Sequence, residues 1–340
     1  MNTIPTIFNE KITPYTAVGC KKRISSIGIS AIVLNHQGLY QRRSFFNDLE
    51  KAGFDNIISI ESCAPHYDIE ELSSRFPLVR FILPENEINL GEQINLGASD
   101  IESPLFFVLR SDMKIIAGGS ARRMAERLIV NAEENDGNSE IKTAFKRLCT
   151  VPVIMNSSYE ILPSLAAPMT QRKTMRTVFF EPNNEGDLSL YPFNGIGIYD
   201  RQRFIHTGGF DITLKHTHWQ LLDFGFRSFL WGEEIALNPH YKLSYDGELP
   251  SENFTVENNY RQFYLKNLAP VFRSDHAHLP LYRFISFLLK SGEDFFCAKE
   301  EFKKVRDWVT KNKFRWRCDA RAVTKLWEPS SFSDKTGEKD

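Results

Sequence analysis

Continuous apolar runs alternate with stretches of helical hydrophobic spacing over residues 27–110. Strands are expected where the runs are short and rich in β-branched residues, at 27–34, 54–62, 79–84 and 104–110. Helices are expected where apolar side chains recur at helical spacing, at 39–52, 68–76 and 91–98. This alternation with short connections predicts an α/β fold whose mostly parallel sheet carries helices on both faces.

Polar residues stand at the end of each expected strand. They are Asn35 and His36, Glu61 and Ser62, Glu85 and Asn86, and Arg110 to Asp112. In open α/β sheets, ligands bind beyond the carboxyl ends of the strands. We therefore expect the binding site at this edge.

The remainder of the chain divides by composition. Residues 118–148 predict a long helical region broken at Asp136-Gly137, and 151–155 predict a strand. Residues 163–190 contain Pro, Gly and Asn and predict a mobile loop or irregular insertion. We expect a lead-in at 1–22, a main domain at 23–250 with halves at 23–117 and 150–250, a C-terminal helical extension at 251–329, and a disordered tail at 330–340.

Composition narrows the function classes. The net charge is -1 over 340 residues, which gives no reason to expect nucleic-acid binding. The five cysteines are scattered without a CxxC pair, so we expect reduced thiols and no zinc site. No long apolar run or signal-peptide pattern is present, so a cytoplasmic location is expected. The aromatic and basic C-terminal region predicts core packing, and a peripheral contact at the inner membrane face is the other interpretation.

Three segments follow one another along residues 27 to 235. The first is IVLNHQGLYQRRSFFNDLEKAGFDNIISIES and the second is ENEINLGEQINLGASDIESPLFFVLRSDMKI. The third is FNGIGIYDRQRFIHTGGFDITLKHTHWQLLDFGFRSFLWG. Together these segments resemble family 2 glycosyltransferases and their GT-A relatives, and the resemblance implies a GT-A-like fold and a nucleoside-diphosphate sugar as the donor.

The diphosphate side of the implied site departs from the family's pattern. Where the Asp-x-Asp motif is expected, the chain has Arg110-Ser111-Asp112. One hypothesis is that Asp112 binds Mg or Mn, completed by the diphosphate and by His276, with His278 and His240 as other candidates. A second hypothesis is that Arg110 meets the phosphate charge directly. A structural ion pair made by Arg110 is the third.

The catalytic base is also altered, because the Glu-Asp pair of the relatives is missing. Asp223 and Asp211 are the carboxylate candidates, and Asp223 with Arg227 equally suits an i,i+4 ion pair. His216 and His218 are expected as base or acceptor contacts, or as ordinary hydrogen-bonded groups.

The resemblance also implies binding roles for other residues. For each of them, the alternative is that the residue only shapes a local turn or is an ordinary polar loop residue. Asn35, His36, Glu61 and Asn95 are expected on the nucleotide sugar, with Gly91 and Gly97 packing a helix close to it. Gly195, Gly208, Gly209, His218 and Arg227 are expected on the acceptor side. The basic residues Arg172, Lys173 and Arg176 are candidates for a lid over the diphosphate.

These observations predict transfer of a sugar from a nucleoside-diphosphate sugar to a glycan, lipid-linked or surface-polymer acceptor. The alternative is a noncatalytic relative that binds a nucleotide sugar or glycan, or scaffolds a polysaccharide assembly. A nucleotidyltransferase is disfavoured, because no Gly-rich phosphate loop with Arg or Lys follows the first strand.

Overall fold

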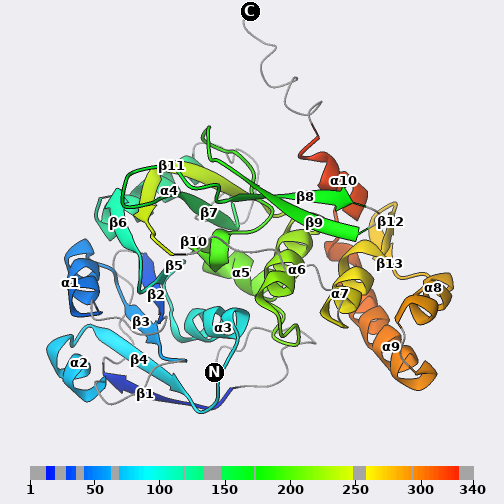
Figure 1. Ribbon diagram of the computed structural model, residues 1–340, viewed down its shortest axis with the longest axis horizontal. Coiled ribbons are helices and arrows are strands. Elements are labelled where there is room, and N and C mark those ends of the chain that lie inside the picture. The colour runs from blue at the N-terminus through cyan, green and yellow to red at the C-terminus, as the bar shows by residue number, and fades with distance from the viewer. Residues whose placement is uncertain are drawn as a thin grey trace, which may run out of the picture.

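The fold is organised around one nine-stranded sheet, shown in the computed structural model of Figure 1. The structure describes residues 13–19, 28–35, 42–62, 69–117, 119–133, 147–171, 174–247, 258–291 and 294–328. The strand order is β1-β4-β3-β2-β5-β10-β7-β11-β6. The strands are β1 (Tyr15–Gly19), β2 (Ile29–Leu34), β3 (Ile57–Ile60), β4 (Val79–Pro84), β5 (Leu105–Arg110), β6 (Lys114–Ala117), β7 (Cys149–Met155), β10 (Gly197–Asp200) and β11 (Ile235–Ser244).

Most of these strands run in one direction, as the sequence predicted. The pairs β4–β3, β3–β2 and β2–β5 are parallel, and β7 is parallel to β11. Strand β10 is antiparallel to both β5 and β7, so the two parallel blocks point the same way. The edge strands β1 and β6 are antiparallel to their neighbours.

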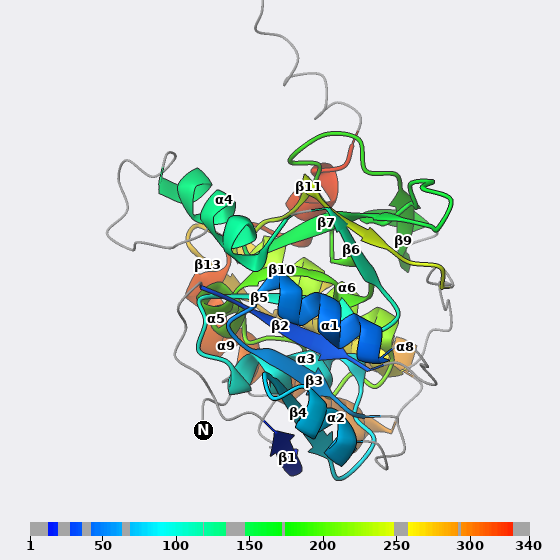
Figure 2. The same cartoon turned by 90° about the vertical axis from the view of Figure 1, so that its left-hand side faces the viewer.

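Helices cover both faces of the sheet. They are α1 (Arg42–Ala52), α2 (Ile69–Arg75), α3 (Leu90–Asp100), α4 (Ala121–Glu133), α5 (Arg201–Thr207) and α6 (Thr217–Leu230). Along β2, Ala31 and Val33 belong to the core cluster that α1, α2 and α4 cover, whereas Ile32 and Leu34 belong to the cluster of α3 and α6. Figure 2 views the sheet from the side that α1 covers.

Some expectations were wrong in detail. The segment 163–190 is mainly a hairpin of β8 (Leu165–Gln171) and β9 (Thr174–Phe180), because Leu165, Ala166 and Met175 are buried against the α6 side of the core. The lead-in at 1–22 contains β1, which adds an edge to the sheet. The predicted break at Asp136-Gly137 and the tail at 330–340 lie outside the described residues.

The C-terminal extension packs onto the α6 face. It contains α7 (Asn258–Phe263), a π-helix at Tyr264–Leu268, the pair β12 (Val271–Arg273) and β13 (His276–His278), α8 (Tyr282–Ser291), α9 (Phe295–Asn312), a short 3-10 helix η3 at Lys313–Arg315, and α10 (Ala320–Lys325). Trp308 of α9 stacks on Trp231 and meets Trp316 edge-on. The extension thereby shares one core cluster with the sheet. In the described part of the chain, no helix is both long and apolar enough to cross a membrane.

Gly225 sets how closely α6 approaches the chain before β10. A Cβ at this position would lie 2.2 Å from the carbonyl oxygen of Leu190. We expect Gly225→Ala to lower the free energy of unfolding by about 1–3 kcal/mol, because a backbone atom must move to admit the methyl group. Urea denaturation measures this. Thr310→Ala on the exposed face of α9 is the control and should change stability by no more than about 0.5 kcal/mol. An unchanged midpoint for Gly225→Ala would contradict the close packing.

Candidate functional site

A cleft of about 490 Å³ opens at the carboxyl edge of β2 and β5. This is the place expected from the strand pattern, and its volume lies in the range of small-molecule sites. Its lining comes from the end of β2 and β5, the loop before α3 with the start of that helix, and the segment leading into α6. The lining residues are Leu34, Asn35, Glu87, Ile88, Asn89, Leu90, Glu92, Gln93, Arg110, Asn194, Lys215 and Thr217.

Asn35 lines this cleft in a fixed orientation. Its side-chain Nδ2 donates to Glu61 Oε2 at 2.7 Å, and its Oδ1 accepts from Ser111 Oγ at 3.1 Å. Two neighbouring strand ends therefore hold the amide in place. His36, the other polar residue expected here, lies outside the described residues.

Glu61 supports the cleft from behind. It is 1% exposed, and its carboxylate also accepts from Arg42 Nη2 at 2.6 Å and Ser59 Oγ at 2.6 Å. A carboxylate bonded on both oxygens inside the protein is not available to a nucleoside. We therefore correct the expected role of Glu61 from ligand contact to positioning of Asn35.

Arg110 and Asp112 form a two-pronged ion pair. Arg110 Nε lies 3.0 Å from Asp112 Oδ1, and Nη2 lies 2.6 Å from Oδ2. The Arg110 guanidinium also lies over the ring of Tyr245, 5.2 Å from its centroid. Such contacts fix the plane of a guanidinium. Arg110 lines the cleft and Asp112 does not.

The described residues do not fit a divalent cation held as the sequence suggested. Both oxygens of Asp112 already accept from Arg110, and no group of three or more His, Cys, Asp and Glu side chains occurs in the described ranges. His276 bonds to Asp275 at 3.0 Å on the β12–β13 hairpin, which lies at the opposite end of the molecule from the β5–β6 connection (Figure 1). A metal site shared by Asp112 and His276 is therefore wrong for this arrangement. His278 is in the same hairpin as His276, and His240 is on β11.

The second cation of the cleft, Lys215, was missed by sequence reasoning. Lys215 is exposed and lies two residues before α6. The segment GFDITLKHTHW has no periodicity that would assign Lys215 to a strand edge, so only the folded chain brings it opposite α3. With Arg110, it places two positive side chains in one small-molecule-sized space.

Helix α3 and its N-cap are tied to that segment and to α6 by four hydrogen bonds. Asn89 Nδ2 donates to the carbonyl oxygen of Ile212 at 3.2 Å, and the Gly91 amide donates to Gln220 Oε1 at 3.0 Å. The Asn95 amide donates to the Phe210 carbonyl oxygen at 2.8 Å and accepts from the Phe210 N–H at 2.9 Å. Both polar groups of Asn95 are thus used to close the loop, which corrects its expected role on the nucleotide sugar.

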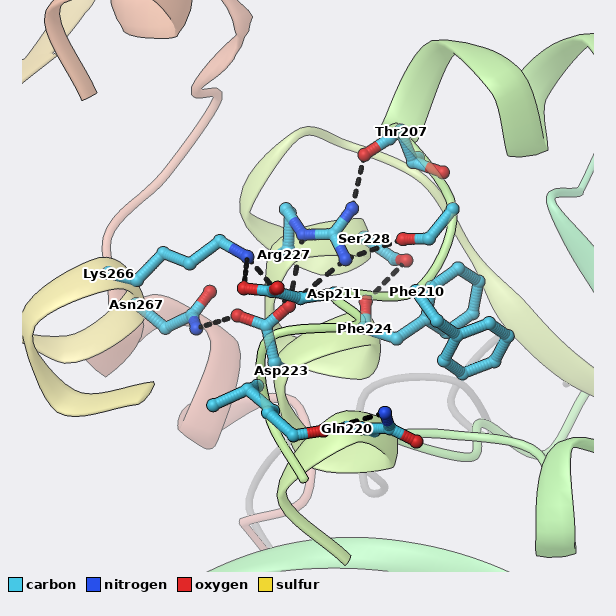
Figure 3. Close-up of polar contacts among 12 residues, drawn as sticks. Thr207, Phe210, Asp211, Gln220, Asp223, Phe224, Arg227, Ser228, Lys266 and Asn267 are labelled. Carbon is cyan, nitrogen blue, oxygen red and sulfur yellow. Dashed lines mark hydrogen bonds and ion pairs between the residues drawn. The ribbon is translucent and has the colours of Figure 1, made fainter. Parts of the chain in front are cut away.

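Four buried charges join α6, the loop before it and the π-helix of the C-terminal extension (Figure 3). Lys266 Nζ lies 3.0 Å from Asp211 Oδ2 and 2.9 Å from Asp223 Oδ2, and Arg227 Nη2 lies 3.0 Å from Asp223 Oδ2. All four side chains are at most 2% exposed. Two positive and two negative charges balance, and this set is called the charge cluster below.

Hydrogen bonds complete the cluster. Asn267 Nδ2 donates to Asp223 Oδ1 at 2.7 Å, and Asp211 Oδ1 accepts from the Thr213 N–H at 3.0 Å. Arg227 donates to the carbonyl oxygens of Thr207 and Gly209, the latter at 2.7 Å. Burial raises the pKa of Asp223, but Lys266, Arg227 and the Asn267 amide outweigh it and hold that pKa below its ordinary value.

The charge cluster corrects the expected catalytic and acceptor-side roles. Asp211 and Asp223 are 1% and 0% exposed, and their oxygens are engaged, so neither can reach an acceptor hydroxyl in this arrangement. We assign both to the fold, together with Arg227 and the Gly209 carbonyl group. Asp223 and Arg227 form the i,i+4 ion pair that was one of the two interpretations of their spacing.

Several of the other predicted site residues make contacts within the fold. Gly195 packs against α3, where an added Cβ would lie 2.6 Å from Ile94 Cδ1. His216 caps α6 by accepting from the His218 N–H at 3.3 Å, and the His218 ring packs edge-on against Trp219. Of the basic loop residues, Arg176 is on β9, and Arg172 and Lys173 lie outside the described residues.

No protein-family model matches the chain, and no curated protein matches its sequence. The fold is similar to the crystal structure of GalNAc-T7 with UDP, GalNAc and Mn2+, with a TM-score of 0.58 and 13% sequence identity over 90% of this chain. The chain spans 57% of the GalNAc-T7 chain. This likeness confirms the GT-A-type fold, and it does not single out family 2.

A second similar structure is the mannosyltransferase PcManGT from Pyrobaculum calidifontis in complex with GDP-Man and Mn2+. It shares 8% sequence identity over 97% of this chain and 84% of that chain, with a TM-score of 0.43. A likeness of this size carries no argument here.

Removing the Lys266 ammonium should make the folded protein less stable. We expect Lys266→Met to lower the free energy of unfolding by about 3–5 kcal/mol, because two buried carboxylates would then share one cation. Adding Asp223→Asn to this variant should recover part of the loss, since it removes one of the stranded charges. Urea denaturation of both variants tests this, and equal stability of Lys266→Met and the wild type would contradict the charge cluster.

His218 should make stability fall in mild acid. Burial and the neighbouring His216 lower the pKa of His218 to about 4, below its ordinary value of 6.5. Between these values the unfolded chain binds a proton that the folded chain does not, so stability is lost as pH falls from 6.5 toward 4. At pH 5 the loss from this group is about 2 kcal/mol. Urea denaturation at pH 7 and pH 5 should show a smaller pH effect in His218→Gln, and an identical one would refute the prediction.

Proposed function

We propose that the chain binds a nucleoside-diphosphate sugar in the cleft and transfers the sugar to an acceptor. The observation that carries this proposal is the position of the cleft, at the carboxyl edge of β2 and β5 in a GT-A-type fold, with Arg110 and Lys215 in its lining. A glycan, lipid-linked or surface-polymer acceptor is proposed from the sequence resemblance alone.

The two cations suit the diphosphate. When the bond between the sugar and the diphosphate breaks, its electron pair goes to the leaving oxygen, and negative charge grows there. Fixed positive groups stabilise that charge in the transition state. Arg110 is held flat by Asp112 and Tyr245, and a guanidinium with two nitrogens on one carboxylate still has N–H donors for phosphate oxygens.

Amide side chains around the cleft supply contacts for the nucleoside. Asn35 is held by Glu61 and Ser111, while Gln93 and Asn194 line the cleft from α3 and from the turn before β10. Amides both donate and accept, which matches the mixed donor and acceptor edge of a base and the hydroxyls of ribose.

We propose that side-chain cations take the place of a divalent metal in this cleft. The GalNAc-T7 structure contains Mn2+, and the sequence predicts Mg or Mn here as well. In this chain the carboxylate that would hold the ion is paired with Arg110, and we propose that the remaining N–H donors of Arg110 and the Lys215 ammonium meet the phosphate oxygens instead.

A base must accept the proton of the acceptor hydroxyl, and it cannot be Asp211 or Asp223, because both are buried in the charge cluster. Glu87 and Glu92 are the carboxylates among the lining residues, and Glu92 also accepts a hydrogen bond from Thr13. We assign the proton acceptor to Glu87, which is exposed. The buried state of Asp211 and Asp223 also favours the second candidate function, a noncatalytic protein that binds a nucleotide sugar without transfer.

Donor binding should depend on Arg110 and not on a metal. We expect Arg110→Gln to weaken binding of UDP or GDP about 10- to 100-fold, the effect of losing one hydrogen-bonded charge. Isothermal titration calorimetry with UDP, GDP and CDP, with and without EDTA, measures this. EDTA should leave the affinity unchanged.

Arg122→Gln is the matched control, because Arg122 also pairs with a carboxylate, Glu126, but on the exposed face of α4. It should bind like the wild type. The proposal is wrong if no nucleotide binds the wild type or if Arg110→Gln binds equally well. Product formation from a panel of donors, lost in Glu87→Gln while binding persists, separates the transferase from the noncatalytic alternative.

A further inference from the structure

Helix α8 is apolar on two opposite faces. Phe287 is 4% exposed, and Phe284 and Leu288 pack beside it against the core. The opposite face carries Leu281, Tyr282, Ile285 and Leu289, whose exposed fractions are 63%, 64%, 64% and 80%. A surface helix normally turns polar residues to water, so an apolar outer face indicates a contact that the folded chain does not itself provide.

The outer face continues onto the beginning of α9. Phe295 and Phe296 are 47% and 76% exposed. The Phe295 ring lies 5.9 Å from that of Phe284 on α8 and 5.7 Å from that of Phe296. Phe295 therefore packs at the junction of the two helices. The exposed apolar side chains on the two helices are called the apolar patch, defined here as Leu281, Tyr282, Ile285, Leu289, Phe295 and Phe296.

Basic residues lie beside this patch on α9. Lys299, Lys303 and Arg306 are exposed. At 100° per residue they fall within about 80° of Phe295 around the helix, on the flank that also bears Phe296. Ala298, Phe302 and Val305 face the core. The acidic residues of α9 lie farther around the helix, Glu300, Glu301 and Asp307 at about 120–140° from Phe295, and Asp294 caps the helix just before Phe295.

The positive charge is a property of the whole end of the chain. Residues 281–328 hold 12 Lys or Arg and seven Asp or Glu, a net charge of +5, in a chain whose total is -1. In Figure 1, α8 and α9 project at the end of the molecule away from α1 and α2. An apolar surface bordered by cations is therefore presented at one end.

We propose that the apolar patch and the basic flank of α9 bind the surface of an anionic membrane. Aromatic and aliphatic side chains would enter the boundary between head groups and acyl chains, while Lys299, Lys303 and Arg306 meet lipid phosphates. A second copy suits the surface less well, because a symmetric contact through this patch brings the same basic flanks together. This inference does not rest on the proposed function.

Flotation of the full chain with lipid vesicles tests the proposal. We expect binding to vesicles of phosphatidylcholine with phosphatidylglycerol, weaker binding to phosphatidylcholine alone, and a decrease with added salt. The double variant Ile285→Glu with Leu289→Glu should reduce binding to anionic vesicles at least about tenfold, by removing apolar insertion. Lys299→Glu with Lys303→Glu should abolish the preference for anionic lipid.

Tyr159→Asn is the matched control, since Tyr159 is 69% exposed in the turn after β7 and is not part of the patch. It should bind vesicles like the wild type. Circular dichroism melting confirms that each variant is folded. The proposal is overturned if the wild type does not float with anionic vesicles. It is also overturned if Ile285→Glu with Leu289→Glu and Lys299→Glu with Lys303→Glu both bind these vesicles as well as the wild type does. It is also overturned if light scattering shows a dimer that Ile285→Glu with Leu289→Glu disperses.

Nucleotide titration of the same variants separates this proposal from the proposed function. The patch and the cleft share no residue, so affinity for UDP or GDP should be unchanged when vesicle binding is lost. Loss of both together would indicate a general defect and would contradict a separate membrane surface.

Discussion

Two buried cations and two buried carboxylates hold the segment that forms one wall of the cleft. Lys266 comes from the C-terminal extension, Asp223 and Arg227 from α6, and Asp211 from the loop between α5 and α6. Charges removed from water are tolerable only when they are paired and hydrogen-bonded. The loop, the helix and the extension must therefore assemble together, and the position of Lys215 follows from that assembly.

The opposite wall depends on a different set of ties. Glu61 fixes Asn35, and Asp112 with Tyr245 fixes Arg110, so the polar groups at the strand ends have defined orientations before any ligand arrives. Helix α3 joins the walls through Asn89, Gly91 and Asn95. Such preorganisation favours binding because little side-chain freedom remains to be lost. Glu61 and Asp112, which the sequence suggested as ligand-binding carboxylates, instead orient the Asn35 amide and the Arg110 guanidinium.

Sequence patterns predicted the part of the fold that is built from continuous apolar strands. Strands β2 to β5 and the ligand edge followed from those runs, and Asn35 and Arg110 were found by their place after them. The edge strands β1 and β6 and the polar, proline-containing β11 carry no such signal, so no strand was predicted at these three places. The i,i+4 spacing of Asp223 and Arg227 is the same whether their helix face is exposed to solvent or buried. Their burial depends on Lys266, 43 positions later, which no local pattern reveals.

We propose that the cleft at the carboxyl edge of β2 and β5 holds a nucleoside diphosphate between Arg110 and Lys215. A crystal structure of the protein soaked with UDP or GDP tests it most directly. We expect electron density for the two phosphates within hydrogen-bonding distance of both side chains, with the base toward Asn35. Density at any other place on the protein, with this cleft holding only water at saturating nucleotide, would contradict it.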